Sequence, residues 1–580
     1  MKCPLNPQSQ RSITVNFSGR HSPRVAVGVL TLAFLLLQTG WSEEIATVYD
    51  SPMLVADRSP LNLMPQSPNT VQVQVDAVKP IGKLDPFWAS QIVHPTEFLL
   101  TDWGRDFIKL ITESGAARQY IRIYNQPENA FRKDADGKIS YDWSDFDKMA
   151  TTILATGCKL NVVFFGMPSE IADHPESVRK RPYGATVCSS PPKDYKQWEE
   201  VCADFTRHVV AKYGLDEVKQ WTFRCWNEPD GGFWYKGDLQ AYLKLYDYFA
   251  KAVKGVCPEI KIGGPGLTSG GTYRKPENLR MFFEHVTAGT NHATGEVGAP
   301  IDYIAVHTYG GSGAGGGPNR QYPELDYMME QQLLFADIRD EFPQLRKMPI
   351  HVEEWGETSG GTTGVAAKPT ADIRNSQYGA AYLAAWVERH IRIRTENDRK
   401  IGGFTFCASG YEKIADHDFM GYRTLDTKSG FHKPILNGYK LLNKLDAELI
   451  AVRTEENKNI TTFATRDKHR ICVVVVNYQH VKPFNDGLTN LVSLQIKSHL
   501  GSGNVVLKHW RIDEKHSNAY TAFKEIGSPK QPDQTQIDAI KKRMDLELLE
   551  PPQRMESKDS FDLKFDLPCN AVSLIEIVKE

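Results

Sequence analysis

Residues 221–256, WTFRCWNEPDGGFWYKGDLQAYLKLYDYFAKAVKGV, contain one complete repeat of the pattern that decides the fold. The stretch begins with WTFRCW, a short apolar and aromatic run that is typical of a buried strand. Residues 239–256 then place apolar side chains at spacings of three and four, as one face of a helix requires. The segment therefore predicts a strand, a loop that contains Gly, and a helix.

Six further strand candidates lie along the chain, separated by helical patterns such as FDKMATTILATG (146–157). They are QYIRIYN (119–125), LNVVFFG (160–166), IKIGGP (260–265), IDYIAVHTY (301–309), PIHVEEW (349–355) and GGFTFCA (402–408). This alternation is typical of parallel βα units. In a βα barrel the chemistry sits at the carboxyl ends of the strands, and polar residues gather at those ends here. The sequence thus predicts an α/β fold with a (β/α)8 TIM barrel over residues 86–444, in preference to an open doubly wound sheet.

The sequence beyond about residue 445 is rich in strand patterns and lacks the patterns of long helices. Its strand candidates are RICVVVVNY (470–478), LVSLQIK (491–497), NVVLKHWRI (504–512), FDLKFDL (561–567) and AVSLIEIV (571–578). Several short strands with turn signals between them predict a C-terminal β-sandwich domain over residues 445–580. An alternating strand within residues 69–85 is expected to join it, and a helix is expected within about 529–550.

Length and charge limit the class of protein. The 580 residues suffice for a barrel of about 250 to 400 residues and a second domain. Hydrophobic residues make up 41% and charged residues 24%, as in a soluble globular protein. The 69 basic and 71 acidic side chains nearly cancel, without a Lys/Arg-rich block that could follow a polyanion. Nucleic acid is therefore not an expected partner.

The first 24 residues carry four basic and no acidic side chains, and an apolar run over residues 25–37 follows. That run is shorter than the roughly 20 residues of a membrane span but suits the core of a signal peptide. Gly40 and Ser42 are small residues placed for cleavage after Ser42. We therefore predict a signal peptide over residues 1–42, a linker over 43–68, export, and no membrane partner after cleavage. The alternative is an uncleaved membrane anchor.

Eight cysteines remain after the predicted cleavage removes Cys3. They are Cys158, Cys188, Cys202, Cys225, Cys257, Cys407, Cys472 and Cys569. Their scatter contains no CxxC pair and no His-interleaved cluster, so neither structural zinc nor another metal is expected. Buried free thiols, or one or two disulfides of undefined pairing, are the remaining alternatives.

Glu228 follows the strand WTFRCW and stands between Asn227 and Pro229. Glycoside hydrolysis uses two carboxyl groups that flank one sugar ring, one of them protonated as an acid. Burial against aromatic side chains can keep such a carboxyl group protonated near neutral pH. Asn227 could then bond the 2-hydroxyl of a sugar. The simpler alternative for Asn-Glu-Pro is a turn before a helix.

A second acidic pair, Glu353 and Glu354, ends the strand IHVEEW. A period of two places the pair on opposite faces, so only one is expected at the barrel mouth, and periodicity does not choose between them. His307 and Tyr309 share a face at the end of another strand. These two are expected to bond to the nucleophile or to substrate.

Two other patterns are not interpreted as sites. Gly311, Gly313 and Gly316 match GxGxxG, but no helix pattern follows directly, so a loop at the rim of the site is expected instead of a dinucleotide site. The segment DADGKISYDW (134–143) is similar to a calcium loop, but its register places unsuitable residues at the first and last ligand positions. A β-turn is expected there, and no cofactor is predicted.

These residues resemble the family 39 glycoside hydrolases, a family of the clan A barrels whose acid/base and nucleophile follow strands four and seven. The resemblance runs from about residue 87 to 578. The segments PPKDYKQWEEVCADFTRHVVAKYG (191–214), YLKLYDYFAKAVKGVCPEIKIGGP (242–265) and HWRIDEKHSNAYTAFKEIGSP (509–529) look like the β-xylosidase branch. α-L-Iduronidases are relatives in the same family.

The resemblance implies a role for each candidate residue. Glu228 matches the general acid/base, Asn227 its sugar-orienting neighbour, and Glu354 the nucleophile. His307 and Tyr309 match the HisxTyr pair that the family places beside the nucleophile. Retention of configuration is then implied, with the two carboxyl groups about 5 to 5.5 Å apart.

Residues of the expected sugar pocket depart from the family pattern. After Arg122 the family often has an imidazole where this chain has Tyr124. Near strand eight, where the β-xylosidase branch has Trp and a Glu-Glu pair, this chain has Phe404, Tyr411 and Glu412. Glu412 matches a carboxylate that binds sugar hydroxyls. These differences leave the sugar open.

The resemblance implies a retaining exo-glycosidase, with β-xylosidase activity on short oligosaccharides as the leading hypothesis. An α-L-iduronidase-like specificity, or one for β-galactosides or α-L-arabinosides, is the alternative within enzymes. A non-catalytic carbohydrate-binding protein on a barrel that has lost its activity is the alternative from another class. The oligomeric state is left open.

Overall fold

The computed structural model describes residues 70–311, 323–396, 401–403, 405–479 and 487–580. The predicted signal peptide and linker lie outside this range, as do Phe404 and two glycines of the GxGxxG match, Gly313 and Gly316. Of the helices in the described ranges, none is both long enough and apolar enough to cross a membrane.

Eight parallel strands form a closed barrel, which confirms the predicted fold. In chain order they are β2 (Ser90–His94), β3 (Tyr120–Tyr124), β6 (Lys159–Phe164), β9 (Thr222–Cys225), β10 (Lys261–Leu267), β11 (Tyr303–Tyr309), β12 (Ile350–Gly356) and β14 (Thr405–Ser409). Each strand pairs with the next along the chain, and the pairing of β14 with β2 closes the ring. All seven strand candidates between residues 119 and 408 correspond to strands of this barrel.

A helix follows each barrel strand. The eight are α3 (Asp102–Glu113), α5 (Ser144–Leu154), α6 (Tyr195–Tyr213), α8 (Leu239–Val256), α10 (Glu277–Ala288), α11 (Leu325–Asp340), α12 (Tyr378–Glu396) and α13 (Pro434–Leu442). Helix α8 has the predicted bounds because the side chain of Asp238 accepts a hydrogen bond from the Ala241 amide at its start. Its buried side chains include Tyr242, Tyr246 and Phe249, which follow the predicted spacing.

The first barrel strand, β2, is absent from the strand candidates. Its sequence SQIVH has only two aliphatic residues, yet all of its side chains except that of His94 are buried. Gln91 is accommodated because its amide donates a hydrogen bond to the carbonyl of Ala116 (3.0 Å). A buried polar side chain is stable when it has a hydrogen-bond partner. It also interrupts the apolar pattern by which a buried strand is recognised in a sequence.

The segment that is similar to a calcium loop is a hairpin of β4 (Phe131–Lys133) and β5 (Ile139–Tyr141). The Gly137 amide donates to the Asp134 carbonyl across the turn (3.1 Å), so the predicted β-turn is confirmed.

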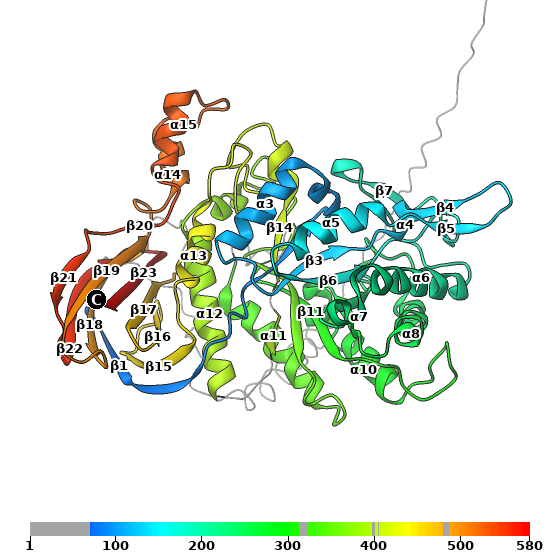
Figure 1. Cartoon of the computed structure of the whole chain (residues 1–580), viewed down its shortest axis with the longest axis horizontal. Helices are drawn as coiled ribbons and strands as arrows, with labels where there is room; N and C mark the ends of the chain where they lie inside the picture. The colour runs from blue at the N-terminus through cyan, green and yellow to red at the C-terminus, as the bar shows by residue number, and fades with distance from the viewer. Residues whose placement is uncertain (1–69, 312–322, 397–400, 404, 480–486) are drawn as a thin grey trace, which may run out of the picture. The chain divides into compact units, whose positions relative to one another are not determined.

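A second, mostly antiparallel sheet contains ten strands. They are β1 (Thr70–Lys83), β15 (Glu448–Thr454), β16 (Ile460–Arg466), β17 (Arg470–Asn477), β18 (Asn490–Lys497), β19 (Asn504–Ile512), β20 (Glu547–Leu548), β21 (Gln553–Glu556), β22 (Ser560–Leu567) and β23 (Ala571–Lys579). Strand β1 lies between β15, to which it is antiparallel, and β18, to which it is parallel. The N-terminal strand thus joins the C-terminal sheet, as the sequence predicts (Figure 1).

This sheet folds over a core of its own, so the predicted sandwich is a single curled sheet. Val73 of β1, Leu494 of β18 and Ile575 of β23 belong to one apolar cluster, although their strands lie far apart in the sheet order. In β17, Val473 faces that cluster while its neighbour Val474 belongs to the core of the barrel. The run CVVVV is continuously apolar because both faces of β17 are buried.

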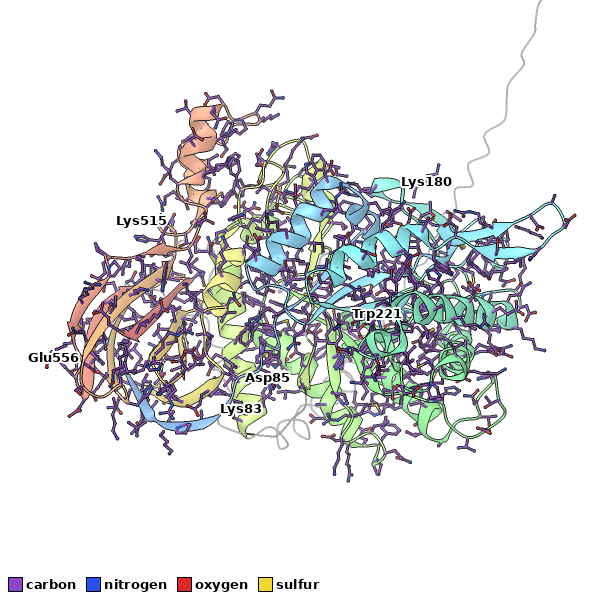
Figure 2. The ribbon with its side chains drawn as sticks, viewed as in Figure 1. Lys83, Asp85, Lys180, Trp221, Lys515 and Glu556 are labelled. Carbon is purple, nitrogen blue, oxygen red and sulfur yellow. The ribbon has the colours of Figure 1, made fainter. Side chains whose placement is uncertain are left out.

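Helices α14 (Ala519–Glu525) and α15 (Gln534–Lys541) extend from the sheet after β19 (Figure 1). The second falls within the predicted helical segment, and the first was not predicted. Phe523 of α14 packs against Phe419 and Phe431, which belong to the loop after β14. Figure 2 labels Lys515 where the chain leaves the sheet toward this helical pair.

Six described cysteines are free thiols, which favours the first of the two cysteine alternatives. They are Cys158, Cys188, Cys202, Cys225, Cys257 and Cys472.

Candidate active site

Glu228 and Glu354 meet at the carboxyl end of the barrel. Glu228 follows β9, the fourth barrel strand, and Glu354 lies near the end of β12, the seventh. One carboxylate oxygen of each and a ring nitrogen of His307 all lie within 4.8 Å of one another. Retaining glycosidases hold their carboxyl groups about 5 to 5.5 Å apart, whereas inverting enzymes need about 6.5 to 9.5 Å. The spacing suits one carboxylate attacking while the other donates a proton.

A β-bulge turns both acidic residues of β12 into the barrel, so the predicted alternation of Glu353 and Glu354 is wrong. In the pairing of β11 with β12, Val306 is opposite Val352 and His307 is opposite Glu354, which leaves Glu353 as an extra residue. Glu353 is 1% exposed, and its Oε2 lies 2.7 Å from the Nε of Arg224. Glu353 is enclosed by the barrel, and Glu354 is the one at the mouth.

Glu354 is held as an ionised carboxylate. Its Oε1 accepts a hydrogen bond from the Arg122 guanidinium (3.0 Å), and its Oε2 accepts one from the Tyr309 hydroxyl (2.7 Å). Burial alone would raise the pKa of Glu354, but the Arg122 guanidinium and the Tyr309 hydroxyl, which both donate to this carboxylate, outweigh burial and hold the pKa well below its usual range. A carboxylate that stays charged in a nearly closed site is suited to act as a nucleophile.

The surroundings of Glu228 favour the protonated form of its carboxyl group, in contrast to those of Glu354. Burial, helped by the charge of Glu354 and then of Asp230, raises the pKa of Glu228 to about 8. Its side chain is still 17% exposed, so it is accessible from the mouth. Two carboxyl groups whose surroundings move their pKa values apart can divide the roles of acid and nucleophile between them.

His307 lies between the two carboxyl groups. Its Nε2 faces the Nη1 of Arg224 (3.3 Å), and a guanidinium can only donate, so Nε2 accepts and Nδ1 carries the proton. Nδ1 then donates to the Oε1 of Glu228 (2.9 Å). Burial keeps the pKa of His307 well below its usual value, so the ring is neutral. This bond leaves the other oxygen of Glu228 to carry the acidic proton.

Asn227 is fixed by two buried arginines. Its Oδ1 accepts from the Nη2 of Arg122 (2.6 Å) and from the Nη2 of Arg224 (3.0 Å). With the oxygen occupied, the amide NH2 is free to face a sugar hydroxyl. Sequence reasoning missed Arg224, although a charged residue within the apolar stretch WTFRCW signals that it needs a buried partner.

Aromatic rings line one side of the mouth. Tyr124 lies 4.9 Å from Phe165 and 6.2 Å from His94, and His94 stacks on Tyr411 at 6.4 Å (ring centroids). Tyr124 and Tyr411, both predicted to lie in the sugar pocket, thus contact the same ring, that of His94 from β2. An imidazole is therefore present on the neighbouring strand instead of at position 124. A His at the end of a barrel strand was the available signal, but β2 itself was not recognised.

Glu412 differs from its predicted place. Its side chain is fully enclosed, and its Oε2 lies 3.0 Å from the Nζ of Lys433. The backbone amides of Met420 and Tyr422 donate to its two oxygens (2.8 and 3.2 Å). The carboxylate holds the loop after β14 in place, and both of its oxygens already have donors there.

Two groups of side chains in the described ranges have spacings that a metal ion could use. One is Glu228, His307 and Glu354, where Arg122 beside Glu354 opposes a cation. The other is Asp247 of α8, His285 of α10 and His292 of the turn after α10, where each carboxylate oxygen of Asp247 already pairs with one imidazole (2.9 and 2.8 Å). Neither group calls for a metal to satisfy its hydrogen bonds.

The pH dependence of kcat/KM is expected to show an alkaline limb with a midpoint of about 8. Glu228 must be protonated to act as an acid, and it loses its proton as the pH rises through its pKa. On the acid side activity is expected to persist below pH 4.5, because Glu354 stays ionised there. Rates measured from pH 4 to pH 10 on one neutral substrate test both limbs.

Asp230→Asn supplies the control for this profile. Asp230 accepts two hydrogen bonds from Thr268, and its charge contributes to the raised pKa of Glu228. The alkaline limb is expected to move to lower pH in this variant. An alkaline limb that stays in place would contradict the assignment of that limb to Glu228.

Comparison with known proteins gives a consistent result. A family profile described as "Glycosyl hydrolases family 39" matches residues 71–553. The chain is 25% identical to a β-xylosidase of Caldicellulosiruptor saccharolyticus over 82% of this chain and 92% of that protein. It is 21% identical to an α-L-iduronidase of Mus musculus over 87% of this chain and 80% of that protein. A crystal structure of a monomeric β-xylosidase from Caulobacter crescentus CB15 shares the fold, with a TM-score of 0.70, 20% identity, and coverage of 88% and 99%.

Proposed function

The chain belongs to family 39 of the glycosyl hydrolases, and on that premise we propose that it is a retaining exo-glycosidase that removes terminal β-xylose from short oligosaccharides. One observation carries the retaining mechanism: a carboxyl group with a raised pKa faces an ionised one across less than 4.8 Å. The β-xylose specificity is supported by the similarity to β-xylosidases along most of the chain.

The reaction has two displacements. Glu228 gives its proton to the glycosidic oxygen while a Glu354 oxygen attacks the anomeric carbon, so the leaving sugar departs as an alcohol and a glycosyl ester remains. Glu228, now a carboxylate, takes a proton from water as that water attacks the same carbon. The sugar is released with its configuration retained, and both side chains return to their starting states.

The neighbouring residues position these two groups. Arg122 and Tyr309 aim the oxygens of Glu354, and His307 directs one oxygen of Glu228 away from the leaving group. Asn227 would bond the sugar 2-hydroxyl, a contact that strengthens in the transition state. Tyr124, His94 and Tyr411 would contact the sugar itself. We further propose export by the N-terminal segment.

A second candidate function, hydrolysis of α-L-iduronides, is favoured by two arginine side chains near the mouth of the barrel. The Nη2 of Arg423 lies 3.3 Å from the Tyr309 hydroxyl, and Arg181 contacts the ring of His94 (2.8 Å to Nδ1). Guanidinium groups in such places could bind the carboxylate of a uronic acid. The match to α-L-iduronidases agrees with this alternative.

A panel of four aryl glycosides separates the two candidates. The members are a β-xyloside, a β-galactoside, an α-L-arabinopyranoside and an α-L-iduronide. We expect the highest kcat/KM on the β-xyloside. Activity on the iduronide alone would replace the proposal with the second candidate. Tight binding of xylose oligomers by calorimetry, with no turnover of any member, would identify a binding protein.

A further inference from the structure

Phe233 is an exposed aromatic side chain next to the proposed acid. It lies in the loop after β9, five positions after Glu228, and is 52% exposed. The guanidinium carbon of Arg179, from strand β7 (Val178–Lys180), lies 3.7 Å from the centre of its ring. The pair places a half-exposed aromatic ring beside a guanidinium group, which can stack on the ring and still hydrogen-bond to an oxyanion.

Arg179 has hydrogen-bonding capacity to spare. It makes no side-chain hydrogen bond and no ion pair with any residue in the described ranges, and it is only partly buried. Stacking occupies one face of the guanidinium but leaves the N–H donors at its edge available. These donors suit the paired oxygens of an oxyanion.

The pair is connected to the aromatic side of the mouth. Trp234 contacts Phe233 edge to face (4.6 Å) and Phe165 (5.7 Å), and Phe165 contacts Tyr124. The Trp226 indole donates to the carbonyl of Trp234 (2.9 Å), which fixes the loop. A continuous series of ring contacts therefore runs from the proposed sugar pocket to Phe233.

The loop after β6 and the loop after β9 are also held together. Lys236 donates its backbone amide to the Ser189 carbonyl (2.8 Å), and Arg181 lies over the Trp234 ring at 5.4 Å. Arg179 lies in β7, and Arg181 follows the end of that strand. Arg179 stacks on Phe233, and Arg181 lies over the next residue, Trp234. The arrangement is a fixed surface and does not depend on one flexible side chain.

We propose that Phe233 and Arg179 form the leaving-group subsite and that it binds a sugar carrying an oxyanion, either a carboxylate or a sulfate. This rests on the proposed function, because a general acid stands on the side of the leaving group. Phe233 covers the C–H face of the second sugar, and Arg179 binds its anionic substituent. The natural substrate is then an oligosaccharide whose second unit is acidic.

Three disaccharides test the proposal. Each has the terminal sugar preferred in the aryl glycoside panel, linked to a neutral sugar, a uronic acid or a sulfated sugar. The wild type is expected to have a higher kcat/KM on at least one acidic disaccharide than on the neutral one. Arg179→Gln is expected to lower kcat/KM about 10- to 100-fold on that acidic disaccharide and less than about threefold on the neutral one. Phe233→Ala is expected to lower it about 10-fold on all three.

Lys180→Gln is the matched control, because Lys180 is an exposed cation next to Arg179 on the same strand (Figure 2). It removes the same charge but is expected to leave all three rates nearly unchanged. Hydrolysis of the glycosyl-enzyme, measured by pre-steady-state kinetics, is expected to be the same in wild type and Arg179→Gln, since the leaving group has already departed.

The outcomes are distinct. No preference of the wild type for either acidic disaccharide, equal losses on acidic and neutral disaccharides in Arg179→Gln, or an equal effect of Lys180→Gln would overturn the subsite. Absence of turnover on every glycoside would instead refute the proposed function. Preference for the uronic acid or for the sulfated sugar identifies which oxyanion is bound.

Discussion

Glu354→Ala is expected to lower kcat by at least about 10⁴-fold, because no other described carboxylate can take its place at the anomeric carbon. Glu353, the adjacent residue, is paired with Arg224 inside the barrel and cannot reach the substrate. Azide fits the space left by the deleted carboxylate and attacks from the same side. We expect azide to restore turnover of an activated aryl glycoside and to give a glycosyl azide of inverted configuration.

The matched control for this experiment is Glu353→Ala. That change leaves Arg224 as an unpaired buried cation, so it is expected to destabilise the fold by about 3 to 5 kcal/mol. Azide is not expected to restore its activity. If Glu354→Ala keeps near-normal turnover, or if azide rescues Glu353→Ala instead, the nucleophile is misassigned.

Glu228→Ala is expected to lower kcat/KM by about 10² to 10⁴-fold on disaccharides, whose leaving groups need a proton. The loss is expected to be much smaller on an aryl glycoside with an acidic phenol, which departs without help. The alkaline limb near pH 8 should disappear at the same time, since Glu228 is the group that titrates there. Azide should give a product of retained configuration, because it acts after Glu354 has formed the ester.

Asp230→Asn provides the comparison, because Asp230 is a second carboxyl group in the same loop. It is expected to keep the wild-type dependence on the leaving group, with only a shifted alkaline limb. A loss of equal size on all leaving groups in Glu228→Ala would show that Glu228 is not the acid.

Strands that contain a sustained apolar run could be predicted, and the first barrel strand, β2, which is short and carries a buried glutamine, could not. LNVVFFG and RICVVVVNY are recognisable because both faces of each strand are buried. SQIVH is not, since Gln91 becomes acceptable in a core only through a carbonyl that lies 25 residues further along the chain. Such a hydrogen bond is a tertiary contact, and no local sequence pattern predicts a tertiary contact.

The same limit applies to the site. Glu228 and Glu354 could be predicted because each stands in a motif at a strand end. The choice between Glu353 and Glu354 depends on a bulge in the pairing of two strands, which periodicity does not reveal. Glu412 was misplaced because its partner Lys433 is a distant residue, and the pairing removes the carboxylate from solvent. Sequence indicated which residue types were present, and packing decided which of them face the substrate.

The position of β1 has a consequence for how the chain folds. Among the described strands, β18 and β22 are hydrogen-bonded to the rest of their sheet only through β1, which pairs with β15 on its other side. During synthesis β1 emerges first, and its partners follow only after the entire barrel has been made. Contacts of such long sequence separation form slowly, because closing a long loop costs entropy before any pairing is gained. The joining of β18 and β22 to the rest of the sheet is therefore expected to be a late step. Residues 445–580 by themselves lack the strand that holds the two parts of this sheet together.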